Sequence, residues 1–299
     1  MFHVKHDLEI IENCPICSDG DFVKYMSCKD HNYSGDIFNI VECKSCGFKF
    51  TNPRPKEKNS HKYYQSGNYI SHTSSKKGLF NTAYHVIRNY QFKKKYSIIN
   101  ELVHKNDKGI LDIGSGTGEF INYFKKKGWV TNGIETDKKA REFSIKNYNC
   151  EVDKSIEDTL EKNKKFDVIT LWHVLEHVYN INDYLLKIKK LLKDDGHIIL
   201  GLPNCKSYDA KHYREFWYAY DLPIHVSHFS KNDIIRLVKK HHLGTLQIKP
   251  LVFDAYYISM LSNKKSGGGM FKGILNGWVS NRKAKKNFEY SSLIYIIKA

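Results

Sequence analysis

The stretch Gly109–Phe120 reads GILDIGSGTGEF, an apolar run that ends in an acid and continues into a turn with three glycines. Ile110, Leu111 and Ile113 are typical of a buried strand, and Glu119 follows the turn at the place where a helix would begin. Glycines at alternate positions let the backbone of a turn approach a ligand closely. The stretch therefore predicts a strand, a ligand-binding turn and a helix, which together open an α/β fold.

The spacing of the glycines separates this turn from a dinucleotide-binding one. Nicotinamide and flavin sites use Gly-x-Gly-x-x-Gly, whereas the glycines here are Gly114, Gly116 and Gly118. Asp112 stands two residues before the first glycine, and its carboxylate would repel a pyrophosphate. An acid at this place favours a ligand with a cationic tail.

The glycine turn resembles motif I of the class I S-adenosylmethionine-dependent methyltransferases. Five segments in order resemble the family's motifs between Lys108 and Ala299, namely 109–120, 129–135, 153–157, 166–177 and 196–204. One glycine turn after a strand is commonly no more than a tight turn, but five matches in the right order are not explained by chance. The resemblance implies a methyltransferase with a Rossmann-like, doubly wound sheet of seven strands.

Hydrophobic patterning predicts that strands and helices alternate over this region. We expect strands near 110–113, 130–134, 149–152, 167–172 and 197–202, and a helix over 182–192. After an aromatic insertion at about 205–229, the pattern predicts a helix near 232–240, a strand near 245–251, a loop over 264–269 and a last strand over 291–297. The family would place that last strand between strands five and six.

The resemblance assigns cofactor-binding roles to residues at the ends of the strands. Glu135 ends the second strand, and the family implies that its carboxylate holds both ribose hydroxyls, which suits a group with two acceptor oxygens. The loop after the third strand would cover the adenine. The residues expected to bind S-adenosylmethionine are Asp112, Gly114, Ser115, Gly116, Gly118, Glu135, Ser155, Ile156, Trp172 and His173.

Two Cys-x-x-Cys pairs near the N-terminus predict a structural zinc site. The pairs are Cys14 with Cys17 and Cys43 with Cys46, and Gly47 follows the second pair as a knuckle glycine would. Four thiolates at this spacing can complete a tetrahedral zinc site, with a redox pair as the alternative. Together with short strands expected over 38–43 and 48–50, they predict a small zinc ribbon over about 10–52.

The chain is expected to have three parts. A zinc-ribbon domain would cover 1–55, a helical and aromatic connector and cap 56–107, and the methyltransferase domain 108–299 with its insertion at about 205–229. Pro53 and Pro55 oppose a helix directly after the ribbon. Helical spacing over 79–103 predicts a helix that packs against the domain that follows.

The first candidate for catalysis is the segment His173-Val-Leu-Glu176-His177, which the family implies to face the cofactor pocket. It resembles the Glu-x-x-Glu-His metal site of the quinone-biosynthesis O-methyltransferases, with His173 in place of the first glutamate. An imidazole there suits a softer metal better than a hard cation. The alternative is that Glu176 and His177 cap or pack the turn after the fourth strand.

The second candidate is the segment 217–230, WYAYDLPIHVSHFS, which resembles the Pro-x-His-x-x-His-Phe-Ser segment of a bacterial methyltransferase group with an N-terminal zinc ribbon. Substrates in that group are often uncharacterised. We expect His225 to be a general base, because histidine titrates near neutral pH, and His228 to orient it or to bond backbone groups of the loop. The catalytic set is therefore His225, His177 and Glu176, with Tyr63–Tyr69 and Tyr208–Tyr220 closing over the acceptor.

Composition limits the partners. The formal charge is +16, but only six of the 48 basic residues are arginine, which favours solvated lysine surface over a nucleic-acid site. No apolar run is long enough to span a bilayer and Met1–His6 lacks a secretory apolar segment, so we expect a cytoplasmic protein. The acceptor is expected to be a small molecule methylated on oxygen or carbon, such as a sugar nucleotide or another cell-envelope or secondary metabolite. An RNA base methyltransferase that binds RNA through the ribbon is the alternative.

Overall fold

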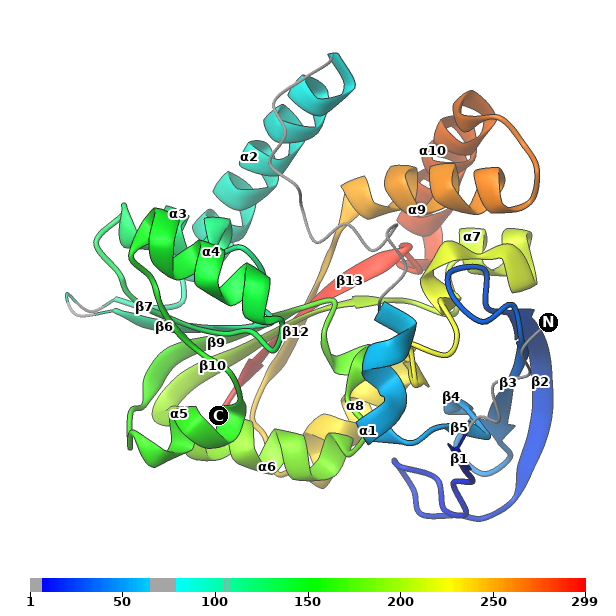
Figure 1. The fold of residues 1–299 in the computed structure, drawn as a ribbon, viewed down its shortest axis with the longest axis horizontal. Helices are drawn as coiled ribbons and strands as arrows, with labels where there is room; N and C mark the ends of the chain where they lie inside the picture. The colour runs from blue at the N-terminus through cyan, green and yellow to red at the C-terminus, as the bar shows by residue number, and fades with distance from the viewer. Residues whose placement is uncertain (1–6, 65–78, 105, 107) are drawn as a thin grey trace. The chain divides into compact units, whose positions relative to one another are not determined.

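The computed structural model describes residues 7–64, 79–104, 106 and 108–299, and of 79–86 it describes the backbone alone (Figure 1). The chain divides into two compact units. Unit 1 comprises Met1–Tyr69, His173–Tyr184 and Leu200–Ile296, and unit 2 comprises Ile70–Trp172, Leu185–Ile199 and Ile297–Ala299. The three-part division expected from the sequence stays a prediction.

A seven-stranded sheet in the order β12-β13-β10-β9-β6-β7-β8 carries the expected doubly wound topology. Its strands are β6 (Gly109–Ile113), β7 (Val130–Ile134), β8 (Glu151–Asp153), β9 (Phe166–Trp172), β10 (Leu192–Pro203), β12 (Leu246–Pro250) and β13 (Ser292–Lys298). Strand β13 lies between β10 and β12, as the family resemblance implies. All expected strands of this sheet are therefore confirmed, and β10 begins at Leu192, earlier than predicted.

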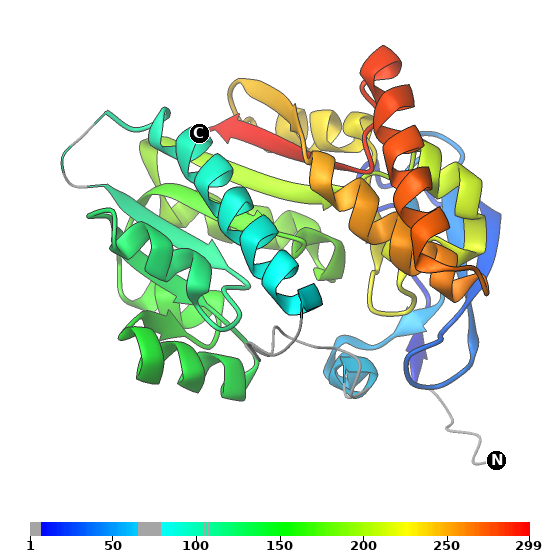
Figure 2. The same ribbon diagram turned by 90° about the horizontal axis from the view of Figure 1, so that it is seen from above.

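Strands β6, β7, β8 and β9 of unit 2 pair in parallel. Strand β6 pairs in parallel with both β7 and β9, and Ile110 and Leu111 are fully buried. Such burial on both faces matches the unbroken apolar run from which the strand was predicted. Helices of this unit include α3 (Glu119–Lys125), α4 (Lys138–Tyr148) and α5 (Ile156–Glu161). Helix α2 (Leu79–Asn100), cyan in Figure 2, is the helix expected before this domain.

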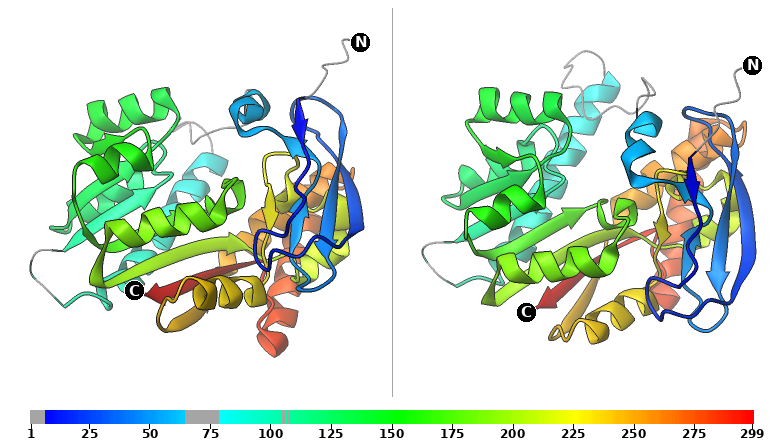
Figure 3. Two further views of the ribbon diagram at one scale, coloured as in Figure 1. Left: turned by 90° about the horizontal axis from the view of Figure 1, so that it is seen from below. Right: turned by 60° about the horizontal axis from the view of Figure 1, so that its bottom comes forward.

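The N-terminal strands of unit 1 form the small sheet predicted around the cysteines. Strands β2 (Phe22–Lys29), β3 (Ile37–Cys43) and β4 (Lys49–Thr51) pair antiparallel, and β1 (Leu8–Glu9) pairs with β5 (Arg54–Pro55). A short strand of the aromatic insertion, β11 (Ser227–His228), adds to the edge of β4 (Figure 3). The insertion is thus part of the ribbon sheet, which the sequence did not predict.

The ribbon and the insertion also share one apolar core. Phe38 and Ile40 of β3 pack in the same buried cluster as Tyr63, Trp217 and Tyr220. The insertion itself folds into α7 (Tyr208–Tyr213), η3 (Arg214–Phe216) and η4 (Tyr218–Tyr220). The ribbon and the insertion that carries His225 are therefore packed against each other.

The remaining helices of unit 1 are α1 (Glu57–Ser60), η1 (His61–Tyr64), η2 (Leu175–His177), α8 (Lys231–Lys240), α9 (Val252–Lys265) and α10 (Met270–Asn287). Helix α6 (Ile181–Leu191) and α8 agree with the predicted ranges. Helices α9 and α10 form a hairpin where only a loop over 264–269 was predicted, and α9 continues through Lys265. No helix in the part of the chain that the structure describes is both long and apolar enough to cross a membrane.

Candidate cofactor and catalytic sites

The glycine turn joins the ends of β6 and β7 in unit 2. The backbone N–H groups of Gly114 and Ser115 both donate to the carbonyl of Ile134, at 2.8 and 3.0 Å. Gly114, Gly116 and Gly118 all have positive φ angles, of 75°, 53° and 83°. This left-handed backbone strains other residues, so the turn requires the glycines that marked it in the sequence.

The missing side chains of Gly118 and Gly116 have different consequences. A Cβ on Gly118 would lie 1.9 Å from Oγ of Ser144, so the missing side chain lets α3 and α4 approach each other. A Cβ on Gly116 would meet nothing within 4 Å. The turn is therefore open on the side of Gly116, so a ligand could contact the backbone there.

Glu135 is held against this open side by two backbone groups. Its Oε2 accepts a hydrogen bond from the N–H of Gly116 and its Oε1 from the N–H of Asp137, both at 2.8 Å. A carboxylate has about four acceptor positions, so each oxygen can accept a further hydrogen bond. The two oxygens are thus oriented and able to take the two adjacent hydroxyls of a ribose.

Asp112 lies almost fully buried at the end of β6. The hydroxyl of Thr170 donates to its Oδ1 at 2.6 Å, and burial raises the pKa of the carboxyl to about 7. A cation beside this group would favour its ionised form. The environment therefore fits a carboxyl that receives a positively charged ligand group.

The other predicted cofactor residues of unit 2 also lie where strands end. Oγ of Ser155 accepts from the N–H of Asp158 and caps α5, whose first residue, Ile156, is buried. Trp172 ends β9, with Nζ of Lys95 3.6 Å from its ring centroid. These residues fit S-adenosylmethionine, because the carboxyl ends of parallel strands meet at one edge of a sheet.

His173, the tenth predicted cofactor residue, belongs to unit 1 and is engaged there. Its Nε2 lies 3.0 Å from Asp254 and its Nδ1 3.6 Å from Glu176. Burial lowers the pKa of His173, but these two carboxylates outweigh it and raise the pKa to about 10. His173 is therefore an imidazolium at neutral pH, and its role toward the cofactor stays a prediction. Asp254 was not singled out from the sequence, because it lies 81 positions away in the unpredicted helix α9.

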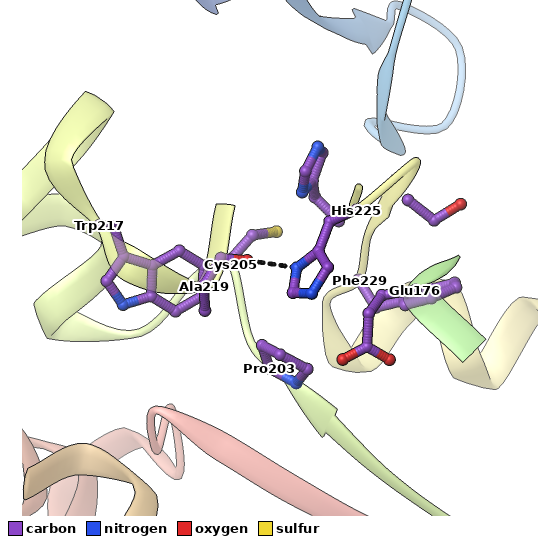
Figure 4. Close-up of a pocket in the computed structure, with 9 residues that line it drawn as sticks. Glu176, Pro203, Cys205, Trp217, Ala219, His225 and Phe229 are labelled. Carbon is purple, nitrogen blue, oxygen red and sulfur yellow. Dashed lines mark hydrogen bonds between the residues drawn. The ribbon is translucent and has the colours of Figure 1, made fainter. Parts of the chain in front are cut away.

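The three predicted catalytic residues come together in unit 1. The metal-binding atoms of Glu176, His177 and His225 all lie within 4.8 Å of one another, and the centroids of the two imidazole rings are 4.6 Å apart. Figure 4 shows Glu176 and His225 of this group. Glu176 is only 1% exposed, and its carboxylate lies 3.6 Å from His173 but accepts no hydrogen bond within the described residues. A buried carboxylate without hydrogen bonds is costly even beside a charged histidine, so Glu176 can still accept a donor from a ligand. Two imidazoles and one carboxylate also form a donor set that suits a divalent metal of intermediate softness, such as zinc.

The tautomer of His225 is set by the loop that carries it. Nδ1 lies 2.8 Å from the carbonyl of Ala219, so Nδ1 carries the proton and Nε2 has the free lone pair (Figure 4). Ala219 was not predicted, because a backbone carbonyl leaves no mark on the sequence.

His177 has a different environment. Its Nδ1 is hydrogen-bonded to the hydroxyl of Tyr64 at 3.0 Å, and burial together with the neighbouring His225 lowers its pKa to about 3. It is therefore a neutral imidazole. Tyr64 belongs to the segment expected to cover the acceptor, Tyr63 lies buried in the apolar core, and 65–69 lie outside the described residues.

His228 acts on the backbone of the loop. Its Nε2 is hydrogen-bonded to Oγ1 of Thr51 at 3.2 Å, and that hydroxyl donates to the carbonyl of His225 at 2.7 Å. His228 thus reaches the backbone of the loop only through Thr51, and its role stays a prediction. The cavity beside Glu176 and His225 has a volume of about 10 Å³, enough for one water or ion but not for an acceptor molecule.

The four N-terminal cysteines gather at one point of the ribbon. Sγ of Cys14 lies 3.5 Å from that of Cys46, and Sγ of Cys17 lies 3.5 Å from that of Cys43. All four sulfurs lie within 4.8 Å of one another, close to the separation of about 3.8 Å that tetrahedral Zn–S bonds of about 2.3 Å require. Gly47, with a φ of 74°, donates its N–H to the carbonyl of Cys43. The residues fit zinc.

Known proteins share this fold and parts of this sequence. Ubiquinone biosynthesis O-methyltransferase from Rickettsia bellii (strain OSU 85-389) is 25% identical over 178 residues, 56% of this chain and 72% of that protein. N-methyltransferase 4 from Papaver somniferum is 27% identical over 134 residues, 40% of this chain and 38% of that protein.

Two solved structures show the same fold at low identity. The cyclopropane synthase MmaA2 from Mycobacterium tuberculosis has a TM-score of 0.51 at 14% identity, covering 70% of this chain and 84% of its own. A putative sarcosine dimethylglycine methyltransferase from Galdieria sulphuraria has a TM-score of 0.51 at 12% identity, covering 71% and 85%. The model of the methyltransferase domain family matches residues 86–247, which is more than half of the 299 residues. The chain therefore belongs to the methyltransferase domain family.

Proposed function

We propose that this enzyme transfers the methyl group of S-adenosylmethionine to an oxygen or carbon atom of a small molecule, such as a sugar nucleotide or another cell-envelope or secondary metabolite. The observation that carries the proposal is Nε2 of His225, next to the buried carboxylate of Glu176, which accepts no hydrogen bond within the described residues. Oxygen and carbon acceptors need a base because their protonated forms are poor nucleophiles.

The cofactor would be held by unit 2. Glu135 would accept hydrogen bonds from the ribose hydroxyls. The ligand would contact the backbone of the turn at its open side, at Gly116, and Asp112 would face the cationic part of the ligand. S-adenosylmethionine supplies a methyl group on a positively charged sulfur, which makes that carbon electrophilic. The protein's own task is to hold this group in line with the acceptor and away from water.

His225 would take the proton of the acceptor through one water, because the cavity beside it has room for a water but not for an acceptor molecule. As the acceptor atom forms its bond to the methyl carbon, its bond to hydrogen breaks and the proton moves to Nε2, while Nδ1 keeps its proton on the carbonyl of Ala219. The imidazolium that results carries a positive charge next to the carboxylate of Glu176. That carboxylate, which also lies 3.6 Å from His173, would therefore stabilise the proton-transfer product.

The ribbon would hold one zinc ion through Cys14, Cys17, Cys43 and Cys46. Four thiolates close the coordination shell, so the metal would support the fold and would not activate water. Because β11 of the insertion pairs with β4 of the ribbon, this support extends to the loop of His225.

The acceptor can be found by following methyl transfer from labelled S-adenosylmethionine into separate metabolite and RNA fractions. The proposal predicts label in a small molecule, on oxygen or carbon, only when the enzyme is active. Label in RNA alone would contradict it and would favour base methylation through the ribbon.

A further inference from the structure

Helix α10 buries a polar and small-residue face, the reverse of an ordinary surface helix. The residues that it buries are Gly273, Gly277, Ser280, Asn281 and Ala284. A Cβ on Gly273 would lie 2.5 Å from Cα of Met260 in α9, so the two helix backbones approach closely, beside each other in Figure 2. Packing through glycines four residues apart is typical of helices that meet in lipid, where large side chains are not needed between them.

Polar contacts fix which face of α10 points inward. Ser280 donates to Oδ1 of Asp209 at 2.8 Å, and Nδ2 of Asn276 donates to the hydroxyl of Tyr213 at 2.8 Å. Nδ2 of Asn281 donates to the carbonyl of Val252 at 2.9 Å. With these bonds in place, the helix cannot rotate its large apolar side chains toward the protein.

Those large side chains lie on the outer face in one row. Phe271 is 75% exposed, Leu275 and Trp278 are each 49% exposed, and Ile274 is 43% exposed. Their spacing of three and four residues places them along one stripe of the helix. Arg282, Lys285 and Lys286 are exposed and continue the same stripe toward the C-terminal end of α10. We call these seven residues the hairpin stripe.

The charge around the hairpin stripe has one sign. No acidic residue occurs over 255–288, whereas basic residues stand at 264, 265, 272, 282, 283, 285 and 286. A second copy docked face to face would bring like charges together, which disfavours a symmetric dimer. A nucleic acid would suit the lysines but would leave Phe271, Ile274 and Leu275 in water.

We propose that the hairpin stripe binds the surface of a membrane rich in anionic lipid. The apolar end of the stripe would enter the boundary between headgroups and acyl chains, where Trp278 is the residue type that such interfaces prefer. The basic end would lie over lipid phosphates, which attract each cation at an anionic surface. This inference depends on the fold of unit 1 alone and stands whatever the methyl acceptor is.

Flotation of the full-length protein with vesicles tests the proposal. We expect binding to mixed phosphatidylglycerol and phosphatidylcholine vesicles, and weak binding to phosphatidylcholine alone. The double variant Phe271→Gln, Leu275→Gln should bind at least about tenfold more weakly, since it removes apolar area that the membrane would bury. Its matched control is Ile10→Gln, Ile37→Gln, which changes two side chains of the ribbon that are 74% and 70% exposed.

A second pair of variants separates charge from apolar contact. We expect the variant Lys285→Glu, Lys286→Glu to lose the preference for phosphatidylglycerol. The control variant is Lys126→Glu, Lys127→Glu, which makes the same change of charge at exposed residues of unit 2. In the unchanged protein, Trp278 is the most exposed tryptophan, so vesicles should shift tryptophan emission to the blue, and Trp278→Phe should remove the shift.

Three results would overturn the proposal. One is equal binding of phosphatidylglycerol vesicles by the Phe271 and Leu275 variant and its control, with both proteins folded by circular dichroism. Another is no vesicle-induced change in the emission of Trp278. The third is a dimer in light scattering, or an RNA complex, that the hairpin variants lose while vesicles do not bind.

Discussion

Glu135 allows the cofactor assignment to be tested at a single residue. Glu135→Ala removes a charged acceptor of ligand hydroxyls, which is expected to cost about 1.5 to 3 kcal/mol of binding free energy, roughly a tenfold to hundredfold rise in Kd. Calorimetry with S-adenosylmethionine measures it. Glu161→Ala is the control, an exposed acid of the same unit that changes the net charge equally. Unchanged affinity in the Glu135 variant would remove the ribose assignment.

His225 can be changed while its loop contact is kept. The amide nitrogen of an asparagine can replace Nδ1 as donor to the carbonyl of Ala219, but it offers no base in place of Nε2. His225→Asn should therefore lower turnover about a hundredfold and leave the affinity for S-adenosylmethionine unchanged. His61→Asn, at an exposed histidine, is the control. Full turnover in the His225 variant would show that the acceptor needs only positioning or that the base lies elsewhere.

Asp112 gives the cofactor affinity a pH dependence of known sign. Its pKa is raised to about 7 in the folded protein, so its contribution to stability is present at low pH and is lost as pH rises through about 7. A cationic ligand favours the ionised carboxyl, so binding releases a proton and affinity should rise between about pH 6 and pH 7.5. Calorimetry in buffers of different ionisation enthalpy measures how many protons are released when S-adenosylmethionine binds. Asp112→Asn should flatten the profile, and a slope that persists in this variant would assign it to another group.

At the scale of elements, the junction of α3 with α4 depends on Gly118. Gly118→Ala combines backbone strain at a φ of 83° with a Cβ 1.9 Å from Oγ of Ser144. Gly128 has nearly the same φ, 84°, but a Cβ there meets nothing within 4 Å. Gly128→Ala should thus cost about 1 kcal/mol of unfolding free energy from strain alone, and Gly118→Ala clearly more. Chemical denaturation compares them, and equal losses would show that the α3 and α4 contact is not tight.

Elements with strong local patterns could be predicted from the sequence, and those made by distant contacts could not. The apolar run before Gly114 predicts a buried strand, and apolar residues spaced three and four apart predict α6. In both cases the spacing of the apolar residues along a short segment is enough to indicate the structure. Strand β11 has two residues and exists only because β4 offers an edge for it. The pairing of His177 with Tyr64 joins residues 113 positions apart, which no local pattern records. Helix α10 was missed because its exposed face, not its buried one, carries the apolar period.

At the scale of the whole molecule, the two proposed ligands bind different compact units. The cysteines of the zinc site and the loop of His225 belong to unit 1, while nine of the ten predicted cofactor residues belong to unit 2. A ligand that binds only the folded state stabilises the elements that hold it. Each ligand should therefore protect its own set of backbone amides.

Hydrogen exchange read by mass spectrometry can measure this separation. S-adenosylmethionine should slow exchange over 112–118 and 133–137, where backbone groups surround the open side of Gly116 and the carboxylate of Glu135. Removal of zinc by a chelator should speed exchange in β2, β3 and β4, because a closed four-thiolate site holds the ribbon together. It should also speed exchange over 217–228, since β11 and Trp217 share the sheet and core of the ribbon. Faster exchange confined to the cysteine knuckles would mean that the insertion holds its own structure and that zinc does not support the loop of His225.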